Sequence, residues 1–164
     1  GSSAGGHLAA LVGTSAGVAS LEDNSMGAAG SSSGVQAVVD YYGPTDFLTM
    51  DDLPAVCEDP MVHLSSDSPE SLLLGCDIRE CPEKVKWANP ITYITADDPP
   101  FLILHGTHDC TVTPESSVLL EKALKGKGVA AALHLLPGAG HGGPQFTSSE
   151  TKSFVLDFLD GIFK

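Results

Sequence analysis

Three residues far apart in the sequence have the side chains that acyl-transfer chemistry needs: Ser3, Asp109 and His141. A serine hydroxyl becomes an effective nucleophile only when a base removes its proton and a third group orients that base. An imidazole and a carboxylate fill these two roles at neutral pH. Because the order Ser, Asp, His is one in which such triads occur, we take these residues as the candidate nucleophile, acid and base.

The candidate nucleophile lies in the first turn of the sequence, where Gly1, Ser3 and Gly5 fit the pattern G-x-S-x-G. In this pattern a strand turns sharply into a helix and holds the serine in a strained, exposed position. A Cβ at either flanking glycine is expected to collide with the neighbouring strand or the following helix. The pattern also fits a flexible Gly/Ser linker, but the apolar residues 8–12 favour a helix. The backbone N–H of Ala4 is the candidate oxyanion donor.

Two apolar runs predict strands that end beside the acid and the base. Residues 101–106 precede the loop that carries Asp109, and residues 130–136 precede a glycine-rich loop that carries His141. The carboxyl ends of parallel strands meet at one edge of a sheet, so these two side chains are expected at the same edge. The glycines around His141 leave its loop free to bring the imidazole to within about 3 Å of Ser3.

The elements that must position these residues alternate between strands and helices, which predicts an α/β fold with about three parallel strands flanked by helices. The third strand is predicted at residues 35–42, before Gly43-Pro44. Asp46, in the loop after it, is an alternative acid, although capping or turn formation is the interpretation that we favour. A helix that opens at Thr113-Pro114 connects the other two strands, so a right-handed β-α-β unit is expected.

Two of the predicted helices have a clear apolar face. The helix after Pro114 is expected to bury Val118, Leu119, Ala123 and Leu124, and the last helix Phe154, Val155, Phe158, Leu159, Ile162 and Phe163. Residues 13–34 are rich in Gly, Ser and Ala and predict a surface loop, with a short helical turn at 24–29.

The other histidines are interpreted as structural side chains. His7 follows the elbow and is expected to pack or to form a hydrogen bond, and His134 is expected to face a polar or covered side of its strand. His105 and His108 flank the acid loop and are candidates for orienting it, although a structural role is the more common one. His63 has no context in the sequence.

Residues 48–98 are the least regular part of the chain and hold two predicted short helices, at 68–74 and 82–88. Met61, Leu64 and Trp87 are candidates for an acyl or aromatic pocket, but a small core is the interpretation that we favour.

Four cysteines allow three complete pairings, of which Cys76 with Cys81 and Cys57 with Cys110 would pin the short helices and tie this segment to the acid loop. Reduced, buried cysteines stay open as an alternative. The irregular spacing argues against zinc. Two disulfides together with the acidic charge would favour a secreted or periplasmic location.

Length and charge limit the function classes. The chain has 164 residues, of which 42% are hydrophobic and 18% charged, as expected for one folded domain. Its net charge of −13 argues against binding to nucleic acids or anionic membranes. No apolar run approaches the length that spans a bilayer.

Four motifs together resemble the bacterial esterase/lipase branch of the α/β-hydrolases, near the acetylxylan and feruloyl esterase-like members: GSSAGGHLAAL, VQAVVDYYGPTDF, NPITYITADDPPFLILHGTHD and LLPGAGHGG. The resemblance implies a catalytic triad of Ser3, Asp109 and His141 and ester hydrolysis through an acyl-enzyme, with no cofactor or metal. It implies short-chain or carbohydrate-linked acyl esters as substrates. It also implies that residues 48–98 form a substrate-shaping insertion within a single hydrolase domain over residues 1–164.

The chain departs from that family in one respect, because residues 1–164 include neither the strands before the elbow nor a His-Gly-Gly loop that completes the oxyanion hole. Loss of one oxyanion donor typically costs about 100- to 1000-fold in rate, so the isolated chain is expected to be a poor enzyme. An exposed sheet edge is expected to promote pairing with another copy or with the missing half. A prolyl-oligopeptidase-like peptidase and a non-catalytic fragment stay open as alternatives.

Overall fold

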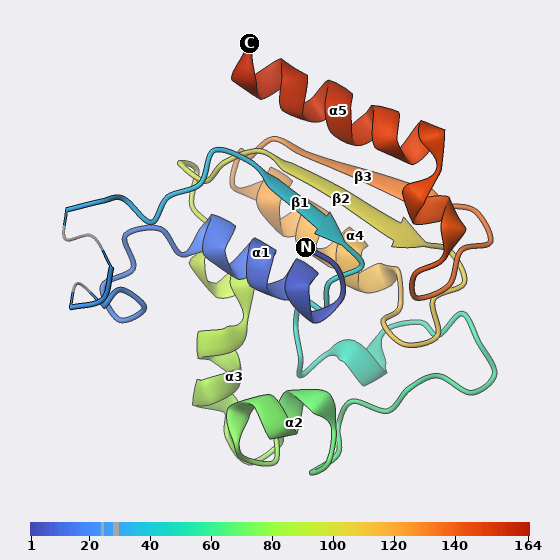
Figure 1. The fold of residues 1–164 in the computed structure, drawn as a ribbon. Helices are drawn as coiled ribbons and strands as arrows, with labels where there is room; N and C mark the ends of the chain where they lie inside the picture. The colour runs from blue at the N-terminus through green and yellow to red at the C-terminus, as the bar shows by residue number, and fades with distance from the viewer. Residues whose placement is uncertain (24, 28–29) are drawn as a thin grey trace.

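The computed structural model describes residues 1–23, 25–27 and 30–164. Strands β1 (Val38–Tyr41), β2 (Phe101–Gly106) and β3 (Ala131–Leu136) form one parallel sheet in that order (Figure 1). This confirms the predicted α/β class and the number of strands, although β1 begins three residues later than predicted. The helical turn predicted at 24–29 lies largely outside the described residues, because positions 24, 28 and 29 are not described.

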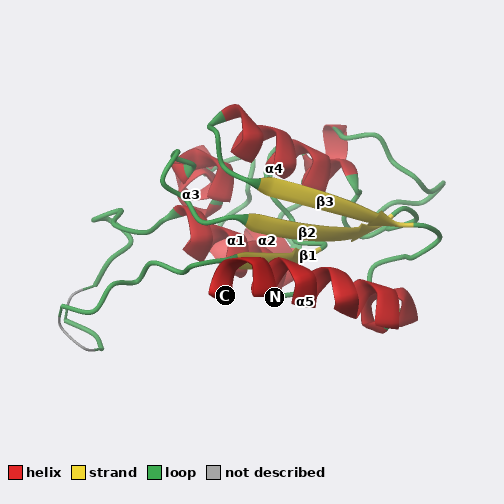
Figure 2. Cartoon of the chain, turned by 90° about the horizontal axis from the view of Figure 1, so that it is seen from above, coloured by secondary structure: helices red, strands yellow, loops and turns green. Residues whose placement is uncertain are grey.

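Helices cover both faces of this sheet. Helices α1 (Ala4–Thr14) and α4 (Glu115–Gly126) pack on one face and α5 (Ser149–Phe163) on the other (Figures 1 and 2). The side chains of β2 alternate between the two layers: Ile103 contacts the α1 and α4 side, and Leu104 the α5 side. Because β2 is the central strand and has helices on both faces, every one of its residues is buried, as the apolar run predicts.

The buried stripe of α4 differs from the predicted one. Its buried residues are Ser116, Ser117, Leu120 and Leu124, whereas Val118 and Leu119 are only half-buried. The stripe follows the spacing of 3 to 4 residues that brings side chains onto one face of a helix, and the two serines lie on it beside the acid loop. The prediction is therefore confirmed for Leu124 and for Ala123, which packs against the same core, but not for Val118 and Leu119.

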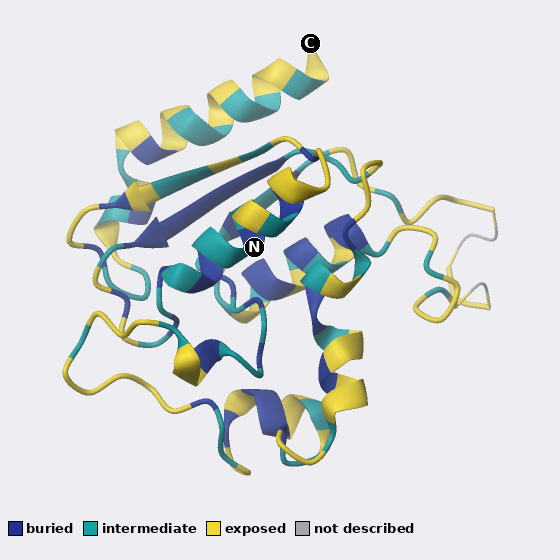
Figure 3. Ribbon diagram, turned by 180° about the vertical axis from the view of Figure 1, so that it is seen from behind, coloured by how far each residue is buried: buried dark blue, intermediate teal, exposed yellow. Residues whose placement is uncertain are grey.

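The apolar face of α5 covers the sheet as predicted, through Val155 and Phe158. His134 of β3 stacks on Phe154 of α5, with 4.2 Å between the ring centroids, which confirms that it faces a covered side. The covering is partial, since Phe163 at the end of the helix is 63% exposed, and Figure 3 shows α5 with intermediate and exposed residues along its length.

Two short helices, α2 (Pro69–Leu74) and α3 (Pro82–Ala88), lie below the sheet layers in Figure 1, within the ranges predicted for them. The Ser68 hydroxyl oxygen accepts the Ser71 N–H, and Gly75 ends α2 with φ of 67°. Leu64 packs in the small core with Phe47 and Ile78, as the favoured interpretation has it. Trp87 is 60% exposed on α3 and is not among the described residues of that core.

Single-turn 3₁₀ helices connect the larger elements. They are η1 (Met50–Asp52), η2 (Pro90–Tyr93) and η3 (Pro144–Thr147). Both cysteine pairs considered from the sequence form disulfides, Cys57 with Cys110 and Cys76 with Cys81, so the alternative of reduced cysteines is wrong. Within the described part of the chain, no helix combines the length and the apolar character needed to cross a bilayer.

Candidate active site

The first turn of the chain has the geometry of a strained elbow. Ser3 has φ of 54° and ψ of −124°, directly before α1. β1 holds this turn on both sides, because the Ser3 N–H donates to the Tyr41 carbonyl at 2.9 Å and the Tyr41 N–H to the Gly1 carbonyl at 2.9 Å. A non-glycine residue at positive φ costs on the order of 1–3 kcal/mol and persists only where its surroundings fix it.

The glycine that lets α1 approach β1 is not the one that the motif singled out. A Cβ at Gly1 would overlap the Gly5 carbonyl, as expected, but a Cβ at Gly5 would meet no described atom within 4 Å beyond its chain neighbours and the backbone of its own helix. The collision predicted at Gly5 is therefore wrong. At Gly6, by contrast, a Cβ would lie 2.9 Å from the Tyr41 carbonyl oxygen and would overlap the Asp40 carboxylate, because α1 crosses β1 there.

The structure brings Ser3, His141 and Asp109 together at the carboxyl ends of the strands. The Ser3 hydroxyl lies 2.8 Å from Nε2 of His141, and Nδ1 of the same ring lies 2.8 Å from Oδ2 of Asp109. With a proton on Nδ1, Nε2 is free to accept the hydroxyl proton, which is the arrangement that general-base catalysis requires. Asp46 does not make this contact, and its carbonyl accepts the Thr49 N–H in a turn, as the favoured interpretation has it.

The Asp109 carboxylate is fully buried and accepts four N–H groups. Oδ1 accepts the N–H groups of Thr111 and Val112 at 2.9 Å each, and Oδ2 accepts from His141 at 2.8 Å and from His105 at 3.1 Å. Burial on its own would raise the pKa of Asp109, but these hydrogen bonds outweigh it and hold that pKa well below its ordinary value. The carboxylate is therefore ionised at neutral pH and can stabilise an imidazolium at His141.

The loops that carry the acid and the base are joined by backbone hydrogen bonds. The His108 N–H donates to the Ala139 carbonyl at 2.9 Å and the Thr107 N–H to the Leu136 carbonyl at 3.1 Å. Gly106 permits this approach, since a Cβ there would lie 2.7 Å from the carbonyl carbon of Ala139. The position of His141 is therefore fixed relative to the acid loop.

Tyr42 packs against the base and has no counterpart in the sequence prediction. Its ring meets the His141 ring edge-on at 4.8 Å and the Phe146 ring at 4.6 Å. Its φ of 46° makes it the second non-glycine residue at positive φ in the described part of the chain. Tyr42 follows β1 directly and precedes Gly43-Pro44, the signal from which the end of this strand was predicted.

The N-terminus of α1 supplies the candidate oxyanion donor. Ala4 is the first residue of the helix, and the first N–H groups of a helix have no acceptor within it. The positive end of the helix dipole lies at the same place, next to Ser3, and favours negative charge that develops there.

Two further histidines, His7 and His63, are buried. His7 is buried, stacks on Phe47 at 4.8 Å and contacts the Pro44 carbonyl, as expected for a structural side chain, and burial lowers its pKa. His63, for which the sequence offered no context, faces acceptors with both ring nitrogens: Glu70 Oε1 at 3.0 Å and the Thr111 carbonyl at 2.7 Å.

An imidazolium could donate from both nitrogens of His63 at once, so the two acceptors favour the charged ring paired with the Glu70 carboxylate. Burial opposes that charge, but the hydrogen bond and the charge of Glu70 outweigh it and raise the pKa of His63. Since Thr111 also donates its N–H to Asp109, this pair supports the acid loop from the side of α2.

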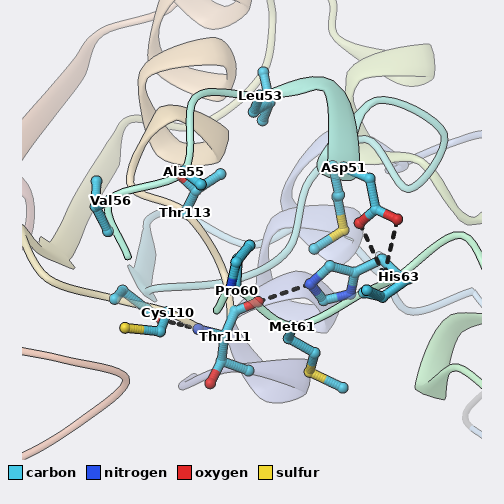
Figure 4. Close-up of a pocket in the computed structure, with 13 residues that line it drawn as sticks. Asp51, Leu53, Ala55, Val56, Pro60, Met61, His63, Cys110, Thr111 and Thr113 are labelled. Carbon is cyan, nitrogen blue, oxygen red and sulfur yellow. Dashed lines mark hydrogen bonds between the residues drawn. The ribbon is translucent and has the colours of Figure 1, made fainter. Parts of the chain in front are cut away.

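A hollow of about 180 Å³ lies on the outer side of the acid loop. Met61, Val56, Cys110 and Thr111 are among the residues that line it (Figure 4). Asp109 lines this hollow, whereas Ser3 and His141 do not. Met61 thus lines a hollow that is separate from the candidate nucleophile. Among the described residues, no group of three or more His, Cys, Asp or Glu side chains is arranged to hold a metal ion.

The sequence of the chain matches one protein family and is similar to bacterial esterases. The BD-FAE family matches residues 1–124. Esterase LipC of Mycobacterium tuberculosis is 35% identical over 150 residues, which are 87% of this chain and 33% of LipC. Esterase LipQ of the same organism is 30% identical over 167 residues, or 99% of this chain and 37% of LipQ. The chain therefore spans about a third of the length of these curated relatives.

Solved structures of esterases have the same fold. A truncated carbohydrate esterase from gut microbiota is 34% identical with a TM-score of 0.81, over 98% of this chain and 57% of that chain. A thermophilic esterase from Thermogutta terrifontis, bound to propionate, is 26% identical with a TM-score of 0.67, over 99% of this chain and 54% of that chain.

Proposed function

Because the chain belongs to the BD-FAE family, we propose that it carries the catalytic triad of a carboxylic ester hydrolase. The observation that carries this proposal is the unbroken series of hydrogen bonds from the Ser3 hydroxyl through His141 to Asp109. The names of the relatives, which are esterases, support the reaction class. Since the chain spans about a third of the curated relatives, the activity of the whole protein is itself part of the proposal.

The proposed mechanism has two steps. His141 takes the hydroxyl proton of Ser3 through Nε2 while Ser3 attacks the ester carbonyl, and Asp109 stabilises the imidazolium that forms. The N–H of Ala4 donates to the oxyanion of the tetrahedral intermediate. The imidazolium then protonates the leaving alcohol, and water activated by the same histidine hydrolyses the acyl-enzyme.

As substrates we propose short-chain or carbohydrate-linked acyl esters. One structural relative is described as a carbohydrate esterase, and another holds propionate, a short acyl group. The segment from residue 48 to 98, which follows the carboxyl end of β1 where Ser3 lies, is proposed to shape the substrate site.

Association with a further segment or a second copy is proposed at the outer side of β1. Five residues that surround an open hollow of about 430 Å³ there are apolar side chains of α1 and β1: Leu8, Ala9, Val12, Val38 and Val39. Such an apolar surface beside a sheet edge favours coverage by other protein.

Replacement of Ser3 in the full-length gene product tests the proposed function. Ser3→Ala should lower kcat on p-nitrophenyl acetate by about a million-fold, the size of the effect known for the serine of subtilisin. Labelling by a fluorophosphonate should be lost at the same time. Ser2→Ala is the matched control, because its serine lies one position away and its hydroxyl has no role in the mechanism.

The two alternatives give different results in the same experiment. A peptidase would cleave peptide p-nitroanilides better than esters and would also depend on Ser3. A non-catalytic fragment would not be labelled by the fluorophosphonate. Retained ester hydrolysis in Ser3→Ala would show that the nucleophile lies elsewhere.

A further inference from the structure

We propose that His105 is a positioning residue for the acid, acting through the Asp109 carboxylate, and this rests on the proposed function of the triad. Nε2 of His105 lies 3.1 Å from Asp109 Oδ2, the same oxygen that accepts the His141 N–H at 2.8 Å. His105 is fully buried at the end of β2, so it cannot touch a substrate. Its effect on the reaction must therefore pass through Asp109.

The surroundings of His105 fix where its proton is. Nε2 faces two acceptors, Asp109 Oδ2 and the Val112 carbonyl at 2.8 Å, so it must carry the proton and donate. Nδ1 lies 2.6 Å from the Ser117 hydroxyl, which is buried on α4 and can donate to the unprotonated nitrogen. Ser117 thereby holds the ring in the orientation in which Nε2 donates to the acid.

This contact supplies a constraint that the rest of the site does not. The N–H groups of Thr111 and Val112 hold Oδ1 of Asp109 in place. They do not bind Oδ2, so they do not by themselves fix the orientation of the carboxylate. Oδ2 is held by His141 and His105, and of these two rings only His105 is fully buried, since His141 is 21% exposed. His105 therefore keeps Oδ2 in place while His141 changes protonation state during turnover.

The test uses two substitutions of His105 in the full-length gene product. His105→Leu removes the donor, whereas His105→Gln retains an N–H at about the position of Nε2. We expect His105→Leu to lower kcat by about 100-fold with KM unchanged, as for a small misplacement of a catalytic group. His105→Gln should keep kcat near the wild-type value.

A second readout does not depend on activity. The proton shared between His141 and Asp109 gives a low-field NMR signal, which should persist in the wild type and in His105→Gln and should be lost in His105→Leu. An unchanged kcat and an unchanged signal in His105→Leu would overturn the proposal. Because the signal is independent of turnover, it separates a failure here from a failure of the esterase assignment, which Ser3→Ala tests.

Two further variants keep the test valid if His105→Leu does not fold. Ser117→Ala removes the donor to Nδ1 and should weaken the signal and lower kcat in the same direction, by less than His105→Leu. A wild-type signal and kcat in Ser117→Ala would then overturn the proposal. Leu124→Ala, at another buried position of α4 but away from the acid loop, should lower stability with kcat unchanged.

Discussion

Asp40 is a buried carboxylate whose ionisation should oppose folding. It lies on β1 with 1% of its surface exposed, and its Oδ1 accepts the Gly43 N–H at 3.0 Å. Its Oδ2 is buried with no hydrogen-bond partner among the described residues. Burial raises the pKa of Asp40 from 3.8 to about 6, although the Gly43 N–H and nearby positive charge partly offset this.

The size and sign of the effect follow from that pKa. The folded protein binds a proton at Asp40 more tightly than the unfolded chain, so stability falls as the pH rises from about 4 to about 6. A pKa change of one unit is worth 1.36 kcal/mol, so the rise from 3.8 to about 6 corresponds to about 3 kcal/mol. This penalty is absent below about pH 4 and complete above about pH 6.

Asp40→Asn should remove the titration, because the amide keeps an oxygen for the Gly43 N–H and carries no charge at any of these pH values. Urea unfolding at a series of pH values gives the free energy of unfolding of each protein. The variant should gain about 3 kcal/mol relative to the wild type between pH 4 and pH 7. Asp97→Asn, which removes an exposed carboxylate, controls for the change in net charge. A difference between Asp40→Asn and wild type that does not vary with pH would refute the reasoning.

Substitution of Gly106 and removal of each disulfide give two further kinds of test. Gly106→Ala should cost about 1–3 kcal/mol in unfolding free energy and lower kcat, because its Cβ would displace the backbone of Ala139, whereas Gly126→Ala, with open space at its Cβ, should cost nothing. Equal stability of the two would contradict this. Replacing Cys57 and Cys110 by serine should cost about 4 kcal/mol, since their disulfide closes 53 residues. Removal of the disulfide between Cys76 and Cys81, which closes only 5 residues, should lower the unfolding free energy by about 2 kcal/mol. A larger loss for this disulfide than for Cys57–Cys110 would contradict the argument from chain entropy.

The sequence predicted most of what depends on local pattern. The apolar run of β2, the glycine-rich loop of His141 and the caps of α2 are local signals, and the structure agrees with each of them. The resemblance to esterases of the α/β-hydrolase superfamily is confirmed by relatives that are named esterases. The catalytic roles of Ser3, Asp109 and His141 remain predictions, which the geometry supports.

Features that depend on distant contacts were not predictable in this way. His63 finds Glu70 and the Thr111 carbonyl only because α2 folds beside the acid loop. Gly6, not Gly5, faces the crowded side of the elbow, because the crossing point of α1 on β1 is set by the sheet. The cysteine pairing was one of three possibilities until the fold brought Cys57 to Cys110.

The backbone at Ser3 also limits which side chains can serve there. Residues branched at Cβ are strongly disfavoured at positive φ, and Ser3 has φ of 54°. Threonine carries a hydroxyl of similar reactivity, yet its extra methyl group would make it a poor replacement in this turn. Cysteine is unbranched and meets no such obstacle, so the elbow admits a thiol more readily than a secondary alcohol.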